Sequence, residues 1–176
     1  SLACRPGINI VAGTGSIAFG VDENNKEKRI GGWGHLCGDE GSAYWLSKKL
    51  MSLFTKQSDG RKKKTILYKT VKEELSLKND FDLIDLVYNK WQGERGKIAS
   101  LAKIINIAAE KGDPLAINLY KKAAEELARH INILSQKMSF KNEILISYSG
   151  GVFKAGDFIL LPLEKEIKAA NNGSVS

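Results

Sequence analysis

Turns rich in glycine are the residues of this chain whose type and spacing suit binding chemistry. The first is Gly13-Thr14-Gly15-Ser16, which stands between two short apolar runs. Glycine lets the backbone come close to a ligand and aim successive N–H groups at it, and the two hydroxyls add donors. The turn therefore suits a phosphate group, with a plain hairpin turn as the alternative. It is not a P-loop, because no Lys-Ser/Thr pair follows.

A longer loop, 31–41, contains five glycines in eleven residues. This density is uncommon unless a ligand or another backbone approaches closely. Trp33 could lie against the apolar face of a sugar ring, or it could anchor the core. Asp39 could accept hydrogen bonds from neighbouring sugar hydroxyls, or it could interact with the N-terminus of the next helix. We interpret His35 as a hydrogen-bonded loop residue rather than a base.

A third candidate is Gly150-Gly151, between an apolar run and a helical segment that includes Lys154. A glycine pair at such a junction would open the N-terminus of the helix to a ligand, and a tight turn is the alternative. Each of the three signals is weak by itself, and their order along the chain carries more information.

The elements that must position these turns follow from hydrophobic periodicity and from helix and turn signals. We predict strands at 8–12, 17–21, 27–30 and 143–148. We predict helices at 42–56, 64–75, 81–90, 97–111, 114–138, 152–161 and 163–170, with Pro162 separating the last two. This order predicts an α/β fold in which a mixed sheet opens as a β-meander and is covered by helices. The sheet is small for its helices, so we expect further strands from a missing segment.

Length and composition are those of a globular domain: the chain has 176 residues, 43% of them apolar, and a net charge of +7. The basic run 61–64 has no interleaved aromatic residues, so we expect a solvated linker and neither a nucleic-acid nor a membrane partner. Cys4 and Cys37 fit no metal or redox spacing, and we expect two free thiols and no metal site in the protein. With no apolar run of about 18 residues and no signal-peptide pattern, we expect a cytoplasmic protein.

In this order, the motifs resemble the N-acetylglucosamine kinase group of the BadF/BadG/BcrA/BcrD ATPases, in the actin, hexokinase and heat-shock-70 superfamily. The stretch from Gly31-Gly32-Trp33-Gly34-His35 through Gly38-Asp39-Glu40-Gly41 to Trp45 is the most specific part. Gly13–Ser16 resembles the second phosphate motif, Gly112-Asp113-Pro114 a turn of the helical block, and Gly150-Gly151-Val152-Phe153-Lys154 the adenosine motif. The resemblance implies a ribonuclease H-like, actin-like ATPase domain.

The resemblance also implies residue roles. The ATP-binding residues would be Gly13, Thr14, Gly15, Ser16, Ala99, Gly150, Gly151 and Lys154. The sugar-binding residues would be Gly32, Trp33, Gly34 and Asp39. The implied reaction is phosphoryl transfer from ATP to a sugar hydroxyl, most simply the 6-hydroxyl of N-acetylglucosamine, with Mg²⁺ bridging phosphate oxygens.

The chain departs from the family pattern. The first phosphate loop, of the Asp-x-Gly-Gly-Thr type, is absent, and so is the catalytic aspartate expected shortly before Ser1. The usual C-terminal helices are also shortened. We therefore expect residues 1–170 to be the C-terminal nucleotide- and sugar-binding domain of a two-domain kinase, with a helical insertion at about 42–138 and a frayed tail at 171–176. The fragment alone would contain no catalytic residue and would be inactive without its N-terminal domain. A homodimer is a further possible partner.

Three alternatives stay open at this point. One is a glucosamine kinase, which uses the same chemistry on a neighbouring substrate. Another is an ATPase activator of an acyl-CoA dehydratase, which would need cysteines around an iron–sulfur cluster; only Cys37 in the loop supports it. The third is a non-catalytic sugar sensor, whose DNA-binding helices would lie outside this chain.

Overall fold

The computed structural model describes residues 5–141 and 143–171, and the chain divides into two compact units. The first unit is Ser1–Ser42 with Lys121–Ser176, and the second is Ala43–Tyr120. The predictions for Cys4 and for the tail after Asn171 lie outside the described residues. Within the described residues, no helix is both long and apolar enough to span a membrane.

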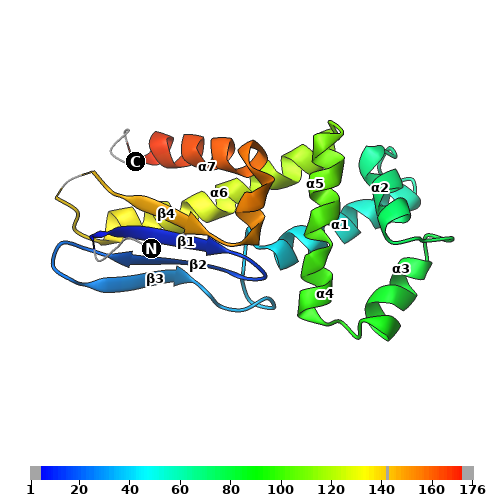
Figure 1. The fold of residues 1–176 in the computed structure, drawn as a ribbon, viewed down its shortest axis with the longest axis horizontal. Coiled ribbons are helices and arrows are strands. Elements are labelled where there is room, and N and C mark those ends of the chain that lie inside the picture. The colour runs from blue at the N-terminus through cyan, green and yellow to red at the C-terminus, as the bar shows by residue number, and fades with distance from the viewer. Residues whose placement is uncertain (1–4, 142, 172–176) are drawn as a thin grey trace. The chain divides into compact units, whose positions relative to one another are not determined.

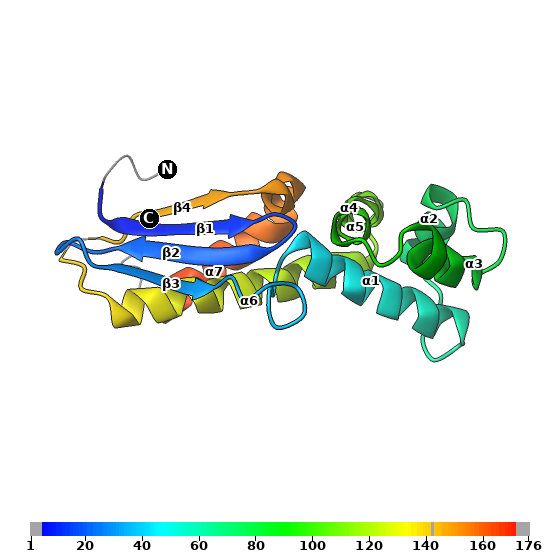
Figure 2. The ribbon, with the colours of Figure 1, turned by 90° about the horizontal axis from the view of Figure 1, so that it is seen from below.

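The first unit is built on a four-stranded mixed sheet with the order β3-β2-β1-β4. Strands β1 (Gly7–Ala12), β2 (Ser16–Val21) and β3 (Glu27–Gly31) form the predicted antiparallel meander, and β4 (Ile146–Ser149) pairs with β1 in parallel. The last part of α6 (Pro114–Lys137) and α7 (Asp157–Ala170) lie on one face of this sheet (Figure 1; Figure 2). The predicted α/β class and meander are confirmed.

Alternating burial explains why the sheet has one covered face. Ile8, Ile10 and Ala12 of β1 are fully buried, whereas Asn9 and Val11 between them are only half-buried. Successive side chains of a strand point to opposite faces, so the buried set faces α6 and α7. Burying each isoleucine contributes about 1.5–3 kcal/mol to folding.

The C-terminal helices differ from the prediction in two ways. Gly151–Ala155 form a 3₁₀ helix (η2), and α7 begins only at Asp157. Pro162 lies inside α7 and does not separate two helices. Proline removes one helical hydrogen bond, but Ile159, Leu163 and Ile167, spaced by four residues, are buried. Their packing holds the helix together across the proline.

The second unit is helical, as predicted. It contains α1 (Ala43–Ser58), α2 (Ile66–Glu74), α3 (Asp82–Ile84), a π-helical turn η1 (Asp85–Lys90), α4 (Arg95–Ser100), α5 (Ala102–Glu110) and the first part of α6. The helix predicted at 97–111 is divided near Leu101. There the Leu101 and Ile104 N–H groups bond carbonyls three residues back, and the Ser100 hydroxyl donates to Lys97 O at 2.6 Å. Such local bonds compete with the α-helical pattern.

Asp113 gives the predicted start of α6 its physical basis. Its Oδ1 accepts the N–H groups of Leu115 and Ala116 at 2.8 and 3.0 Å, which are otherwise unpaired at a helix N-terminus. Its Oδ2 accepts the N–H of Leu67 at 2.7 Å, at the start of α2. One fully buried carboxylate therefore caps α6 and fixes α2 beside it.

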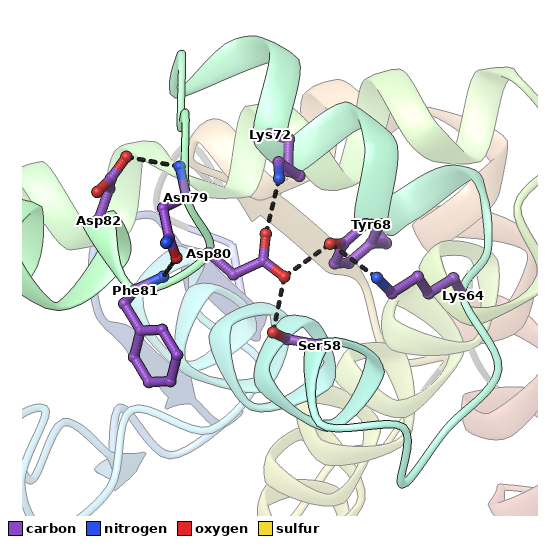
Figure 3. A network of polar contacts seen from close by, with 8 residues as sticks. All are labelled: Ser58, Lys64, Tyr68, Lys72, Asn79, Asp80, Phe81 and Asp82. Carbon is purple, nitrogen blue, oxygen red and sulfur yellow. Dashed lines mark hydrogen bonds and ion pairs between the residues drawn. The ribbon is translucent and has the colours of Figure 1, made fainter.

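Asp80 is the centre of a second polar network in this unit (Figure 3). Its carboxylate accepts hydrogen bonds from Ser58, Tyr68 and Lys72 at 2.7, 2.6 and 2.8 Å, and Lys64 donates to the Tyr68 hydroxyl at 3.0 Å. Burial alone would raise the pKa of Asp80, but the bonds from Lys72, Tyr68 and Ser58 hold it well below its usual range. The network ties the segment before α3 to α1 and α2, so its role is structural.

Candidate functional site

The end of the sheet where β1, β3 and β4 finish and β2 begins gathers all three glycine turns (Figure 2). The first turn, Gly13–Gly15, closes the hairpin between β1 and β2. The Gly13 N–H donates to Gly15 O at 2.9 Å, and Thr14 is exposed. A side chain built at Gly13 would meet no atom within 4 Å. The turn is therefore open on its outer side, as a phosphate-binding turn must be.

Not every predicted donor of this turn points outward. The Ser16 N–H donates to Asp39 Oδ1 at 3.2 Å, and the Ser16 hydroxyl donates to Glu40 O at 2.7 Å. Together with the internal bond of Gly13, these contacts narrow the candidate phosphate donors to the N–H groups of Thr14 and Gly15 and the Thr14 hydroxyl. Ser16 instead serves as the link between the hairpin turn and the loop after β3.

We call this loop, residues 31–42, the glycine loop. Its backbone conformation depends on its glycines. Four of its glycines have a backbone φ between 71° and 82°: Gly31, Gly32, Gly34 and Gly41. Residues other than Gly, Asn and Asp rarely adopt this conformation. The Gly32 N–H donates to Ser16 O at 3.0 Å, which continues the sheet contact into the loop. At Gly41, a Cβ would lie 2.7 Å from Leu127 Cγ, so α6 packs directly on the backbone.

Asp39 connects the glycine loop to the hairpin turn. It is 3% exposed and has φ of 58°, which is uncommon for a residue with a side chain. Its bond to the Ser16 N–H means that one carboxylate oxygen supports the turn Gly13–Ser16, hereafter called the phosphate turn for its predicted ligand. The sequence predicted Asp39 as a sugar ligand; that role stays a prediction, and the structure adds this second contact.

The third turn packs directly on the first. Gly150 follows β4 with φ of 114°, and a Cβ there would lie 2.3 Å from Ala12 O and 2.9 Å from Gly13 N. Two backbones therefore meet where only glycine fits. Gly151, by contrast, has open space around its Cβ position. The pair leads into the short 3₁₀ helix η2 and not into α7, so the predicted continuous helix at 152–161 was wrong.

The remaining predicted site residues have different surroundings. Trp33 is 71% exposed, with the Arg29 guanidinium 5.9 Å from the centroid of its ring, so it is no core anchor. Lys154 is exposed on η2. Ala99 belongs to the second unit, where its carbonyl accepts the Ser47 hydroxyl at 3.3 Å, and its place beside a nucleotide stays a prediction. Cys37 is an exposed free thiol in the glycine loop.

Sequence reasoning missed His130, which lies on α6 beneath the glycine loop. A Cβ at Gly31 would lie 3.1 Å from His130 Nε2. Burial lowers the pKa of His130 from its ordinary value, against the opposing effect of Glu40 and Glu126. The signal was available, since His130 stands three residues after Leu127 and four before Leu134, on the apolar side of α6.

Two further features bear on what the site can bind. Across residues 5–141 and 143–171, no three His, Cys, Asp or Glu side chains gather as a metal site. An open groove of about 770 Å³ lies elsewhere, between β4 and α7, and its lining includes Ile10, Leu163 and Ile167. None of the residues of the three turns lines that groove. The candidate site is the exposed backbone of the turns, whose N–H groups suit phosphate and hydroxyl oxygens.

Comparison with known proteins shows the family of the chain. Residues 3–174 match the model of the BadF/BadG/BcrA/BcrD ATPase family. The N-acetylmuramic acid/N-acetylglucosamine kinase of Clostridium acetobutylicum is 37% identical over 149 residues, which are 84% of this chain and 48% of that protein. The N-acetyl-D-glucosamine kinase of Dictyostelium discoideum is 30% identical over 163 residues, 92% of this chain and 51% of that protein. The chain spans about half the length of the curated relatives it matches.

Solved structures support the fold. The proposed N-acetylglucosamine kinase of Chromobacterium violaceum superposes with a TM-score of 0.75 at 24% identity, over 99% of this chain and 55% of that chain. A ROK-family glucokinase from Streptomyces griseus, solved with glucose and AMPPNP, gives a TM-score of 0.53 at 18% identity, over 94% of this chain and 50% of that chain. The predicted actin-like α/β fold is confirmed.

Proposed function

This chain belongs to the BadF/BadG/BcrA/BcrD ATPase family, and we propose that it is the nucleotide- and sugar-binding domain of an ATP-dependent amino-sugar kinase. The observation that carries the proposal is the meeting of three glycine turns at one end of the sheet, with Ser16 and Asp39 bonded between two of them. Turns with bare backbone can lie against a triphosphate and a sugar at the same time.

In the proposed complex, each turn has its own ligand group. Thr14 and Gly15 donate to ATP phosphates, and Gly150 and Gly151 lie beside the adenosine with Lys154 at the rim. Ala99 is a further proposed ATP-binding residue. Gly32, Trp33 and Gly34 hold the sugar with Asp39, and the exposed indole of Trp33 offers an apolar face for the sugar ring. Names of relatives point to N-acetylglucosamine as the acceptor.

Phosphoryl transfer depends on positioning ATP and the sugar hydroxyl and on neutralising the negative charge of the phosphates. The turns offer N–H donors for phosphate oxygens, and we propose that Mg²⁺ arrives with the phosphates of ATP. When bound, Mg²⁺ would neutralise charge on those oxygens. We assign the base that takes the sugar proton to a separate N-terminal domain, as the other half of a two-domain clamp in a cytoplasmic enzyme.

A phosphotransfer assay tests the proposal. A longer protein that carries the proposed N-terminal domain should convert N-acetylglucosamine and MgATP to ADP and the sugar 6-phosphate, identified by ³¹P and ¹³C NMR. This chain alone should give no product above a control without enzyme, because we assign the base to the N-terminal domain.

Acceptor comparison and metal analysis separate the alternatives. Faster phosphoryl transfer to glucosamine than to N-acetylglucosamine would identify glucosamine as the acceptor. A brown colour with bound iron would favour the activator of an acyl-CoA dehydratase. If the longer protein phosphorylates no amino sugar, the proposal of an amino-sugar kinase is refuted. Turnover by this chain alone would refute the assignment of the base to another domain and direct attention to Asp39.

A further inference from the structure

His130 occupies a place that the proposed reaction leaves without a role. It is one of two histidines in the chain, and it lies on α6 under the first residues of the glycine loop. Its Nε2 and Cδ2 atoms lie 3.1 and 3.4 Å from the Cβ position of Gly31. Its Nδ1 is buried and has no hydrogen-bond partner among the described residues. The Nε2 side of the ring is therefore in close contact with the loop, whereas the buried Nδ1 makes no hydrogen bond to a described residue.

Two carboxylates face this imidazole. Glu40 belongs to the glycine loop, and Glu126 stands one turn earlier on α6. Glu126 also bonds Arg129 at 2.7 Å, so part of its charge is already compensated. Burial outweighs both carboxylates and lowers the pKa of His130. The neutral imidazole is consequently the form that fits the packed loop at neutral pH.

We propose that His130 is a positioning residue of the glycine loop: the neutral ring supports the left-handed backbone at Gly31, and protonation of the ring displaces residues Gly31–Trp33. The expected effect of this protonation on sugar binding rests on the proposed function, in which these residues hold the sugar.

The physical reason is the unsatisfied Nδ1. Once protonated, both ring nitrogens are donors, and a buried donor without an acceptor is unfavourable. The cation can gain water or approach Glu40 only if the ring or the loop moves. Movement of the loop would act on the bond from the Gly32 N–H to Ser16 O, which joins the loop to the phosphate turn. One proton would thus alter both halves of the site.

The test is an NMR pH titration of the ¹⁵N-labelled chain, from pH 8 to pH 5, without ligand. The amides of Gly31 and Gly32 and the indole N–H of Trp33 should titrate with the midpoint of His130, below the ordinary value of about 6.5. The shifts should disappear in His130→Gln and persist in the control His35→Gln, because His35 is the only other histidine.

Loop shifts that persist in His130→Gln, or that disappear in His35→Gln, would overturn the proposal. If His130→Gln does not fold, the same titration of Gly31→Ala provides a second test, because the alanine methyl group would press on His130 Nε2. The midpoint of His130 itself should then move, and an unchanged midpoint would overturn the proposal.

A sugar arm separates this inference from the proposed function. N-acetylglucosamine should bind the chain less tightly below the His130 midpoint than above it, by on the order of fivefold or more, and equally at both pH values in His130→Gln. Equal affinity at both pH values in the unmodified chain would overturn the functional part. Absence of sugar binding at every pH, with the loop shifts intact, would instead count against the sugar site and leave the coupling of His130 to the loop standing.

Discussion

Gly150→Ala is expected to destabilise the sheet unit by more than about 3 kcal/mol, whereas Gly151→Ala, one residue later, should be nearly neutral. An alanine Cβ at position 150 would lie 2.3 Å from Ala12 O, and the residue would have to keep φ of 114°. Neither backbone can yield without breaking the pairing of β1 with β4, so clash and strain act together.

The measurement is thermal and urea unfolding of the two variants beside the unmodified chain, followed by circular dichroism. For a chain of this length, a loss of this size lowers Tm by roughly 6–12 °C. Gly151→Ala is the matched control, since its Cβ position is open and its φ is not positive. Similar Tm values for the two variants would show that the close approach of Gly150 to Ala12 is not a feature of the protein.

Asp39→Ala should have the second largest effect, and it should act on both halves of the site. The Ser16 N–H would lose its acceptor in a buried place, which costs about 1–3 kcal/mol. Alanine also tolerates φ of 58° less well than aspartate does. We expect weaker binding of ATP as well as of N-acetylglucosamine, because the phosphate turn loses its support.

Asp39→Asn and Glu40→Gln divide this effect into parts. The amide oxygen of asparagine can still accept from Ser16, so Asp39→Asn should keep most of the stability and lose sugar affinity. Glu40 meets the Ser16 hydroxyl through its backbone carbonyl, so Glu40→Gln should leave nucleotide binding unchanged. Calorimetric titrations with ATP and with sugar measure these losses. If Glu40→Gln weakened ATP binding as much as Asp39→Ala, the assignment of the link to the Asp39 carboxylate would be wrong.

Local sequence patterns predicted most of the fold, because the strands and helices have clear apolar periodicity. The β-meander and α6 were found almost to the residue, since Gly13, Gly112 and Pro114 mark their limits in ways that steric rules explain. The errors arose where tertiary packing overrides a local rule. Pro162 remains inside α7 because buried side chains on both sides of it hold the helix.

The site was only partly predictable for a similar reason. Glycine density indicated where the backbone turns sharply, but no local pattern indicates that Gly150 lies against Ala12 or that Asp39 reaches Ser16, 23 residues earlier. Such contacts depend on how the strands are ordered in the sheet. His130 was overlooked because a histidine on an apolar helix face is usually part of the core.

The most direct test of the central claim is to map which amides respond when the Mg²⁺ complex of a non-hydrolysable ATP analogue is added to the ¹⁵N-labelled chain. We expect the largest shifts together at Thr14–Gly15 and at Gly150–Gly151, and N-acetylglucosamine should add shifts at Gly32–Gly34. Shifts that avoid these turns, or that gather along the groove between β4 and α7, would contradict it.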